Sequence, residues 1–242
     1  MEKELYIFEY PGIFEKTNQD SSIISQIHSK LKTQSIDVRV ISDLTLFAEG
    51  ELEEKCNKEF LLSPTQVLDG TDLTIQFLKT HNISTLYAIG SDNFICRLQK
   101  SGIKVYTESD HENVKVEEIP LKNDVQAVII SIDPHYNFRR ISLATRYAIE
   151  KKCLYYSVGS ERYFQTPTGD YFAGSYTLAT PISVASSTEI HVIGISSMEI
   201  FTDLSSFSVI HLIGTTSALS DYCKIIQAIN NNIDSQISLN NL

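Results

Sequence analysis

Short apolar runs alternate with amphipathic stretches along most of the chain. The apolar runs cover residues 5–8, 38–41, 85–89, 125–132, 154–158, 190–193 and 209–213. Each run has the length of a strand and is almost continuously hydrophobic, as in strands that are covered on both faces. Strands that alternate with helices are typical of βαβ units. The pattern therefore predicts an α/β fold with a mostly parallel sheet.

Helical spacing is found between these runs. Ser63, Pro64 and Gln66 have the spacing of an N-cap, a proline at the first helical position and a capping-box partner, so a helix is predicted to begin at Ser63. Residues 137–149 and 221–230 each place apolar side chains on one face, which predicts two further amphipathic helices.

The charge and the cysteines narrow the class of protein. The formal net charge is −10, from 30 acidic and 20 basic residues, which disfavours direct binding to the nucleic-acid backbone. Cys56, Cys96, Cys153 and Cys223 are scattered and form no C-x-x-C motif, so neither a zinc site nor a disulfide framework is expected. No apolar run reaches the roughly 20 residues of a membrane-spanning helix. We expect an unprocessed protein of the cytosol or an organelle matrix, with reduced thiols and no membrane span.

Three motifs after residue 125 carry a resemblance to a known family. They are DPHYNF at 133–138, VGS at 158–160 and FAGS at 172–175. In this order and spacing they resemble the 4-nitrophenylphosphatase, phosphoglycolate phosphatase and pyridoxal phosphate phosphatase branch of the haloacid dehalogenase superfamily. The resemblance implies a Rossmann-like core with a parallel sheet, at residues 1–64 and 163–242, and an inserted α/β cap at 65–162.

The same resemblance implies where the catalytic groups of the family would lie. The first family strand ends in D-x-D-G, whose first aspartate attacks phosphorus and whose second handles the leaving-group proton. Here Glu9 stands at the nucleophile position, Pro11 at the acid/base position, and Gly12 is retained. A glutamate is one methylene longer, and a proline has no proton to give.

The other three family motifs are changed to different degrees. Ser42, at the end of the second strand, matches the hydroxyl that contacts the phosphoryl group. Ile195 stands where the family has the lysine of its third motif, and Thr215 stands where it has a magnesium-binding aspartate. Hard cations need converging oxygen ligands, so the magnesium site is expected to be lost and no cofactor is expected.

These substitutions lead to the prediction of a protein that is not an enzyme. The predicted function is that of an inactive pseudophosphatase, a structural or protein-interaction subunit of a larger assembly that forms homo- or hetero-oligomers through the cap. Two alternatives stay open. One is a regulator that binds a phosphorylated metabolite through a vestigial anion site at Gly12, Ser42 and Asp43, and the other is a weakly active phosphatase that uses Glu9.

Overall fold

A computed structural model describes six stretches of the chain: residues 4–10, 36–60, 66–111, 114–165, 170–194 and 206–213. By its contacts the chain divides into two compact units, each of which is described by itself. The first unit comprises Met1–Ser42, Gly50–Asp69 and Ile195–Leu242, and the second comprises Asp43–Glu49 and Gly70–Gly194.

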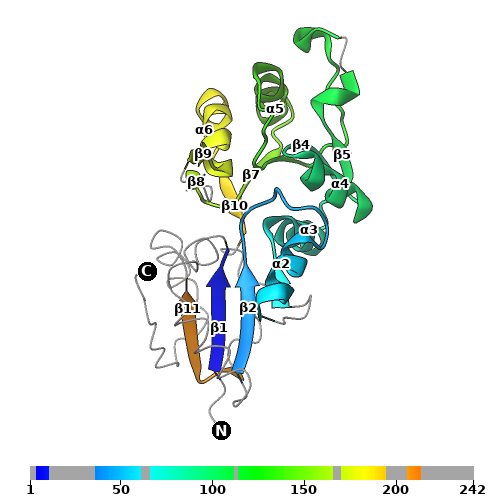
Figure 1. Cartoon of the computed structure of the whole chain (residues 1–242). Helices are drawn as coiled ribbons and strands as arrows, with labels where there is room; N and C mark the ends of the chain where they lie inside the picture. The colour runs from blue at the N-terminus through cyan, green and yellow to red at the C-terminus, as the bar shows by residue number, and fades with distance from the viewer. Residues whose placement is uncertain are drawn as a thin grey trace. The chain divides into compact units, whose positions relative to one another are not determined.

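The first unit contains a four-stranded parallel sheet. Its strands lie in the order β11 (Val209–Ile213), β1 (Glu4–Glu9), β2 (Ile36–Ile41) and β3 (Val67–Leu68). Figure 1 shows β11, β1 and β2 side by side with their arrows in one direction. Leu5, Ile7 and Phe8 of β1 are almost fully buried, as expected of a strand that is covered on both faces. The helix α2 (Glu51–Phe60) belongs to the same unit.

The second unit contains a five-stranded sheet, also parallel. Its strands lie in the order β10 (His191–Ile193), β7 (Leu154–Val158), β6 (Ala127–Ile130), β4 (Thr85–Ile89) and β5 (Lys104–Tyr106). All residues of β4 and β6 are buried. These two central strands therefore form the middle layer of this unit.

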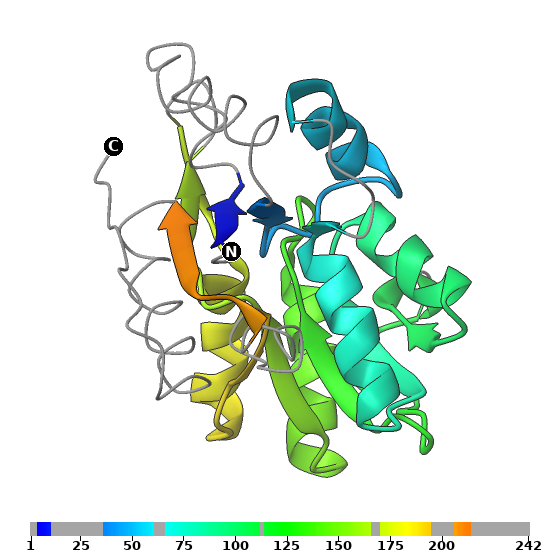
Figure 2. The same cartoon turned by 90° about the horizontal axis from the view of Figure 1, so that it is seen from below.

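Helices cover both faces of the five-stranded sheet (Figure 2). One face packs against α3 (Gly70–Thr80) and α4 (Asp92–Lys100), and the other packs against α5 (Phe138–Glu150) and α6 (Ser175–Ser186). The smaller elements are the antiparallel pair β8 (Tyr163–Gln165) and β9 (Tyr171–Ala173), and the 3-10 turns η2 (Glu108–His111) and η3 (Val116–Glu118). The unit is a three-layer α/β/α arrangement.

The predicted α/β fold with parallel sheets is confirmed, and one predicted helix is wrong. Val67 and Leu68, inside the helix expected from Ser63, form β3 on the edge of the first sheet, and the helix begins only at Gly70. Pairing with β2 outweighs the local helix signal here. The helix expected at 137–149 is confirmed as α5, where the Asn137 side chain caps the backbone N–H of Arg140 at 3.0 Å. The helix expected at 221–230 lies outside the described residues.

The compact units differ from the expected core and cap at their ends. The resemblance places residues 163–194 in the core. In the structure, however, β10 pairs with β7 and α6 packs against the second sheet, so residues 163–194 belong to the second unit. The loop 43–49 belongs there too, because Thr45 and Ser131 form a buried hydrogen bond and the Ser91 hydroxyl donates to the Thr45 carbonyl oxygen. The division into a core of residues 1–64 and 163–242 and an inserted cap of residues 65–162 stays a prediction. Across the described stretches, every helix is too short or too polar to cross a membrane.

Candidate functional site

The carboxyl ends of β1 and β2 bring two of the expected site residues together in the first unit. Glu9, the last residue of β1, lies opposite Ile41 in the parallel register, and the N–H of Tyr10 donates to the Ile41 carbonyl oxygen at 2.9 Å. Ser42 follows Ile41 directly, and its N–H donates to the Leu68 carbonyl oxygen of β3 at 2.9 Å. The carboxyl edge of a parallel sheet is where α/β folds gather their functional groups. Glu9 and Ser42 are therefore neighbours on the edge that the resemblance assigns to the reaction.

These two side chains differ in exposure. Ser42 is fully buried, whereas Glu9 is half-buried. Hydrogen bonds from both neighbouring strands fix the backbone at this edge. The backbone that carries Glu9 is thus held in place, and the residue is partly exposed to solvent.

Asp43, which follows Ser42 in the sequence, belongs to the second unit and is surrounded by glycines. A methyl group on Gly194 would lie 2.8 Å from Asp43 Oδ1, and one on Gly159 would lie 3.0 Å from Asp43 Cβ. One on Gly70 would lie 2.5 Å from the Asp43 carbonyl oxygen. The backbone at the ends of β7 and β10 thus approaches Asp43 closely, which only glycine permits. A role of Asp43 in anion binding stays a prediction.

This close approach can be tested at Gly159, where φ is +81°. Gly159→Ala is expected to destabilise the protein by more than Gly102→Ala. Gly102 has a similar φ of +90°, but a methyl group added there would have no other atom within 4 Å. The control should cost about 1 kcal/mol, the penalty of a left-handed backbone for alanine, and Gly159→Ala should add the clash with Asp43. Urea unfolding followed by far-ultraviolet circular dichroism gives both values. An equal decrease in the free energy of unfolding for both variants would show that the nearby Asp43 does not require a glycine at position 159.

The remaining motif positions lie outside the described residues. They are Pro11, Gly12, Ile195 and Thr215. Their identities are known from the sequence, and their expected roles stay predictions.

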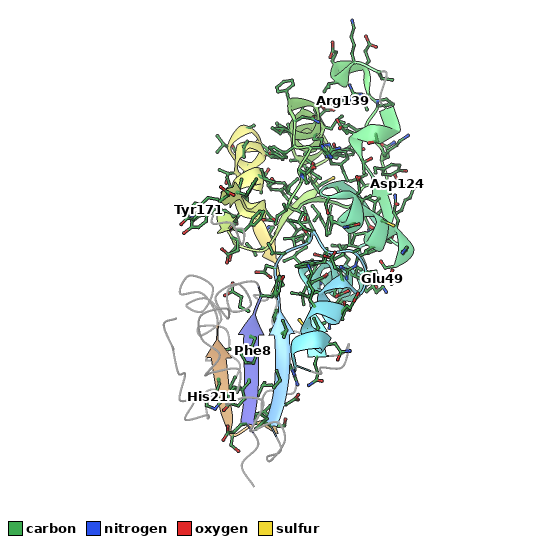
Figure 3. All side chains as sticks on the ribbon, viewed as in Figure 1. Phe8, Glu49, Asp124, Arg139, Tyr171 and His211 are labelled. Carbon is green, nitrogen blue, oxygen red and sulfur yellow. The ribbon has the colours of Figure 1, made fainter. Side chains whose placement is uncertain are left out.

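The second unit contains a cluster of arginine and carboxylate side chains that the sequence did not predict. Arg140 of α5 donates through Nε to Glu108 Oε1 at 2.8 Å and through Nη1 to Asp133 Oδ2, whose side chain is 0% exposed. Arg139, labelled in Figure 3, forms an ion pair with Glu108 Oε2 at 3.7 Å. Asp133 also accepts from the backbone N–H of His135 at 2.8 Å, which places His135 in a turn after β6. Glu108 is distant in the sequence from the other members of the cluster. The sequence signal for the cluster was therefore limited to Arg140, seven residues after Asp133.

The surroundings of the cluster raise the pKa of two side chains, Arg140 and Tyr136. Burial opposes the charged form of Arg140, but the hydrogen bonds to Asp133 and Glu108 outweigh it and raise the pKa of the guanidinium. Nearby, burial and the negative charge of Asp133 raise the pKa of Tyr136 to about 12. Tyr136 therefore stays a neutral hydrogen-bond donor, and its hydroxyl donates to the Leu178 carbonyl oxygen of α6. The cluster ties the turn after β6 to both covering helices of this face.

Comparisons with known proteins identify the fold. No family model matches the chain. Over 83 residues, 34% of the chain, it is 29% identical to glycerol-3-phosphate phosphatase of Rattus norvegicus, and this match spans about a quarter (26%) of that protein's length. Among solved structures, a mutant of thermostable p-nitrophenylphosphatase from Bacillus stearothermophilus has a TM-score of 0.70 at 13% identity, covering 97% of this chain and 87% of that one. The chain has the fold of the haloacid dehalogenase-like phosphatases. The glycerol phosphate phosphatase of Mycobacterium tuberculosis in complex with magnesium has the same fold, with a TM-score of 0.68 at 12% identity over 96% of this chain and 66% of that one.

Two predictions from the sequence are contradicted by these comparisons. The prediction that the chain is not an enzyme is wrong, because the curated relative and the two solved structures described above are named phosphatases. The prediction that the chain has lost its magnesium site and takes no cofactor is contradicted, because the Mycobacterium tuberculosis phosphatase of the same fold is in complex with magnesium. Both predictions rested on the residues substituted at the motif positions, Glu9, Pro11, Ile195 and Thr215. A substitution at a motif position changes the site but does not by itself show that the activity is lost.

The next feature of the first unit is its supply of side chains that could bind magnesium. No group of three or more His, Cys, Asp or Glu side chains gathers within the described residues. Magnesium, however, usually keeps several waters and takes one or two carboxylates together with substrate phosphate oxygens. The half-buried Glu9 carboxylate supplies one oxygen ligand of the required type. Within the described part of the first unit, Glu9 is therefore a candidate ligand for a magnesium ion that binds together with a phosphorylated substrate.

Proposed function

We propose that the chain is a magnesium-dependent phosphate monoester hydrolase with Glu9 as its nucleophile. The observation that carries this proposal is the placement of Glu9 beside Ser42 at the carboxyl edge of the first sheet, in a fold whose solved examples include p-nitrophenyl phosphatases. The match of the glycerol-3-phosphate phosphatase segment supports the same class of substrate.

In the proposed reaction one Glu9 oxygen attacks phosphorus, and the bond between phosphorus and the ester oxygen breaks. The alcohol leaves as its alkoxide and takes a proton from water. A second water then hydrolyses the acyl phosphate, which releases inorganic phosphate and restores the Glu9 carboxylate. Ser42 would donate a hydrogen bond to a phosphoryl oxygen, and the second Glu9 oxygen would hold the metal. Magnesium, when bound, would supply positive charge against the phosphoryl oxygens.

The sequence supports a slow reaction. Positioning and charge stabilisation provide most of the rate of phosphoryl transfer, and a reacting atom displaced by about 1 Å can lose about 10²-fold. The extra methylene of Glu9 displaces the attacking oxygen in this way. Ile195, at the lysine position, cannot pair with a phosphoryl oxygen.

Pro11 leads to a prediction about the leaving group. Because proline cannot protonate the departing oxygen, hydrolysis should be much faster for esters of acidic alcohols than for alkyl esters. 4-Nitrophenyl phosphate should therefore be turned over at least about 10²-fold faster than glycerol 3-phosphate at saturating magnesium, a factor typical of general acid catalysis. A series of aryl phosphates of graded leaving-group pKa would measure this dependence. Equal rates for the two substrates would contradict a missing acid, and Pro11→Asp is expected to narrow the gap.

As a second role we propose that the second unit, the expected cap, binds a protein partner. Large hydrophobic side chains are exposed there, among them Phe138 at 79% and Val184 at 76%. Tyr163, Tyr171 and Phe172 of the β8–β9 pair are also exposed, and aromatic side chains are enriched at protein interfaces. A subunit of an assembly that keeps slow phosphatase activity would combine both roles.

The size of the native protein tests this second role. Purification from the source under mild conditions, followed by sedimentation, should give a species larger than the 27.2 kDa chain. Tyr171→Ser combined with Phe172→Ser should reduce that size and leave phosphate release unchanged. A native monomer that is stabilised by a phosphorylated metabolite without turnover would instead favour a regulator.

A further inference from the structure

The second unit has a pocket of about 190 Å³ that the proposed phosphatase reaction does not use. Gly90 at the end of β4 and Asp92 at the start of α4 line one side of it. Its other polar lining residues are Thr107 and Ser109, which follow β5, Gln99 of α4 and Arg140 of α5. The pocket is thus built from the carboxyl ends of two neighbouring parallel strands and the helices beside them.

The order of the strands singles out this place in the sheet. From β4 the chain passes to β5 on one side, and then to β6 on the other side of β4. The helices α4 and α5, which follow β4 and β6, cover opposite faces. In open α/β sheets ligands bind outside the carboxyl ends of the strands at such a switch point. The pocket contains residues from both sides of it.

Two opposite charges of the lining are available to a ligand. Arg140 uses Nε for Glu108 and Nη1 for Asp133, and its Nη2 has no hydrogen-bond partner in the described part of the chain. The Asp92 carboxylate, on the first turn of α4, makes no hydrogen bond or ion pair with any described residue. Arg140 is held in place by its two carboxylate partners, so Nη2 is preorganised rather than freely rotating.

The charges around the pocket decide the chemistry of the ligand. Glu108 and Asp133 already offset the charges of Arg139 and Arg140, and Asp92 adds a further negative charge. A free anion is therefore disfavoured, because negative charge prevails. A ligand with a carboxylate for Arg140 Nη2 and an ammonium group for Asp92 matches both ends. The volume lies below the roughly 300–1,000 Å³ of pockets for drug-sized ligands, so the ligand has few heavy atoms.

We propose that this pocket binds a small α-amino acid in its zwitterionic form. Arg140 Nη2 and the hydroxyl of Ser109 hold the carboxylate, and Asp92 holds the ammonium group. All its lining residues belong to the second unit, and none of them has a role in the proposed phosphatase reaction.

Calorimetry and thermal unfolding of the full chain test this proposal with glycine, L-alanine and L-serine. Two matched probes lack one charge each: N-acetyl-L-alanine has no ammonium group, and L-alaninamide has no carboxylate. Saturable binding is expected for at least one of the three amino acids, and binding at least about tenfold weaker for the blocked probes, which corresponds to the loss of one charge-assisted hydrogen bond. No saturable binding by any of the three amino acids, or equal binding by the blocked probes, would overturn the proposal.

Variants separate this site from a general effect of charge. Asp92→Asn should weaken binding at least about tenfold, the same loss of a charged contact. Glu117→Gln removes a carboxylate from η3, away from the pocket lining, and should leave binding unchanged. Arg140 is left intact, because its loss would unpair the buried Asp133. Unchanged binding in Asp92→Asn would show that Asp92 only stabilises the start of α4 and that the assigned site is wrong.

Discussion

Replacing Glu9 with glutamine is expected to abolish magnesium-dependent hydrolysis of 4-nitrophenyl phosphate, and replacing it with aspartate is expected to increase it. Glutamine has the shape of glutamate but cannot attack phosphorus as an anion. Aspartate is one methylene shorter and restores the length of the family's nucleophile. Since about 1 Å of misplacement can cost about 10²-fold, Glu9→Asp should gain up to about 10²-fold in kcat.

Phosphate release at saturating magnesium measures both variants, with Glu117→Gln as a matched carboxylate control in the second unit. The control should keep the wild-type rate. Wild-type activity that persists in Glu9→Gln would assign the reaction to another group. A decrease in Glu9→Asp would show that the pocket is shaped around the longer side chain.

The second large effect concerns the stability of the second unit. Asp133→Ala is expected to lower the free energy of unfolding by about 3 kcal/mol, because it removes the buried partner of Arg140. The value lies at the lower end of the range for broken buried ion pairs, since Arg140 keeps Glu108. Asp133→Asn should cost less, because its carbonyl oxygen can still accept from the His135 N–H.

Asp124→Asn is the matched control for this prediction. Asp124 forms an ion pair with Lys104 at 2.8 Å, but both side chains are about half exposed, so its loss should leave stability unchanged. The chain has no tryptophan, and unfolding is therefore followed by circular dichroism, or by hydrogen exchange where the two units unfold separately. Equal stability of Asp133→Ala and the control would mean that the cluster is not a stabilising element.

The hydrophobic pattern predicted the strands well, because continuous burial on both faces leaves a local trace. Three of the predicted strands, at 85–89, 154–158 and 209–213, have the observed bounds. The helix expected from Ser63 failed because β3 forms through pairing with β2, a partner distant in the sequence. The helix α4 was missed, although Ser91 caps it by accepting from the Phe94 N–H at 3.3 Å. With nine residues, α4 is a short helix, although its apolar side chains lie on one face.

The sequence predicted only those residues of the candidate site that lie at the end of a predicted strand. The sequence placed Glu9 and Ser42 at two strand ends, and the parallel register makes them neighbours. The pocket of the second unit could not be predicted, since Asp92, Ser109 and Arg140 come from three different elements and meet only through the strand order. The inference from substituted residues to lost enzymatic activity was wrong, because a motif describes the usual solution of a chemical problem and not every solution.

The most direct test of the proposed function is phosphate release by the purified full chain from 4-nitrophenyl phosphate, with magnesium and with excess EDTA. The account predicts slow turnover that depends on magnesium, stops with EDTA and is absent in Glu9→Gln. Release no faster than in buffer at every magnesium concentration and pH, by a protein whose circular dichroism is that of a folded α/β chain, would contradict it.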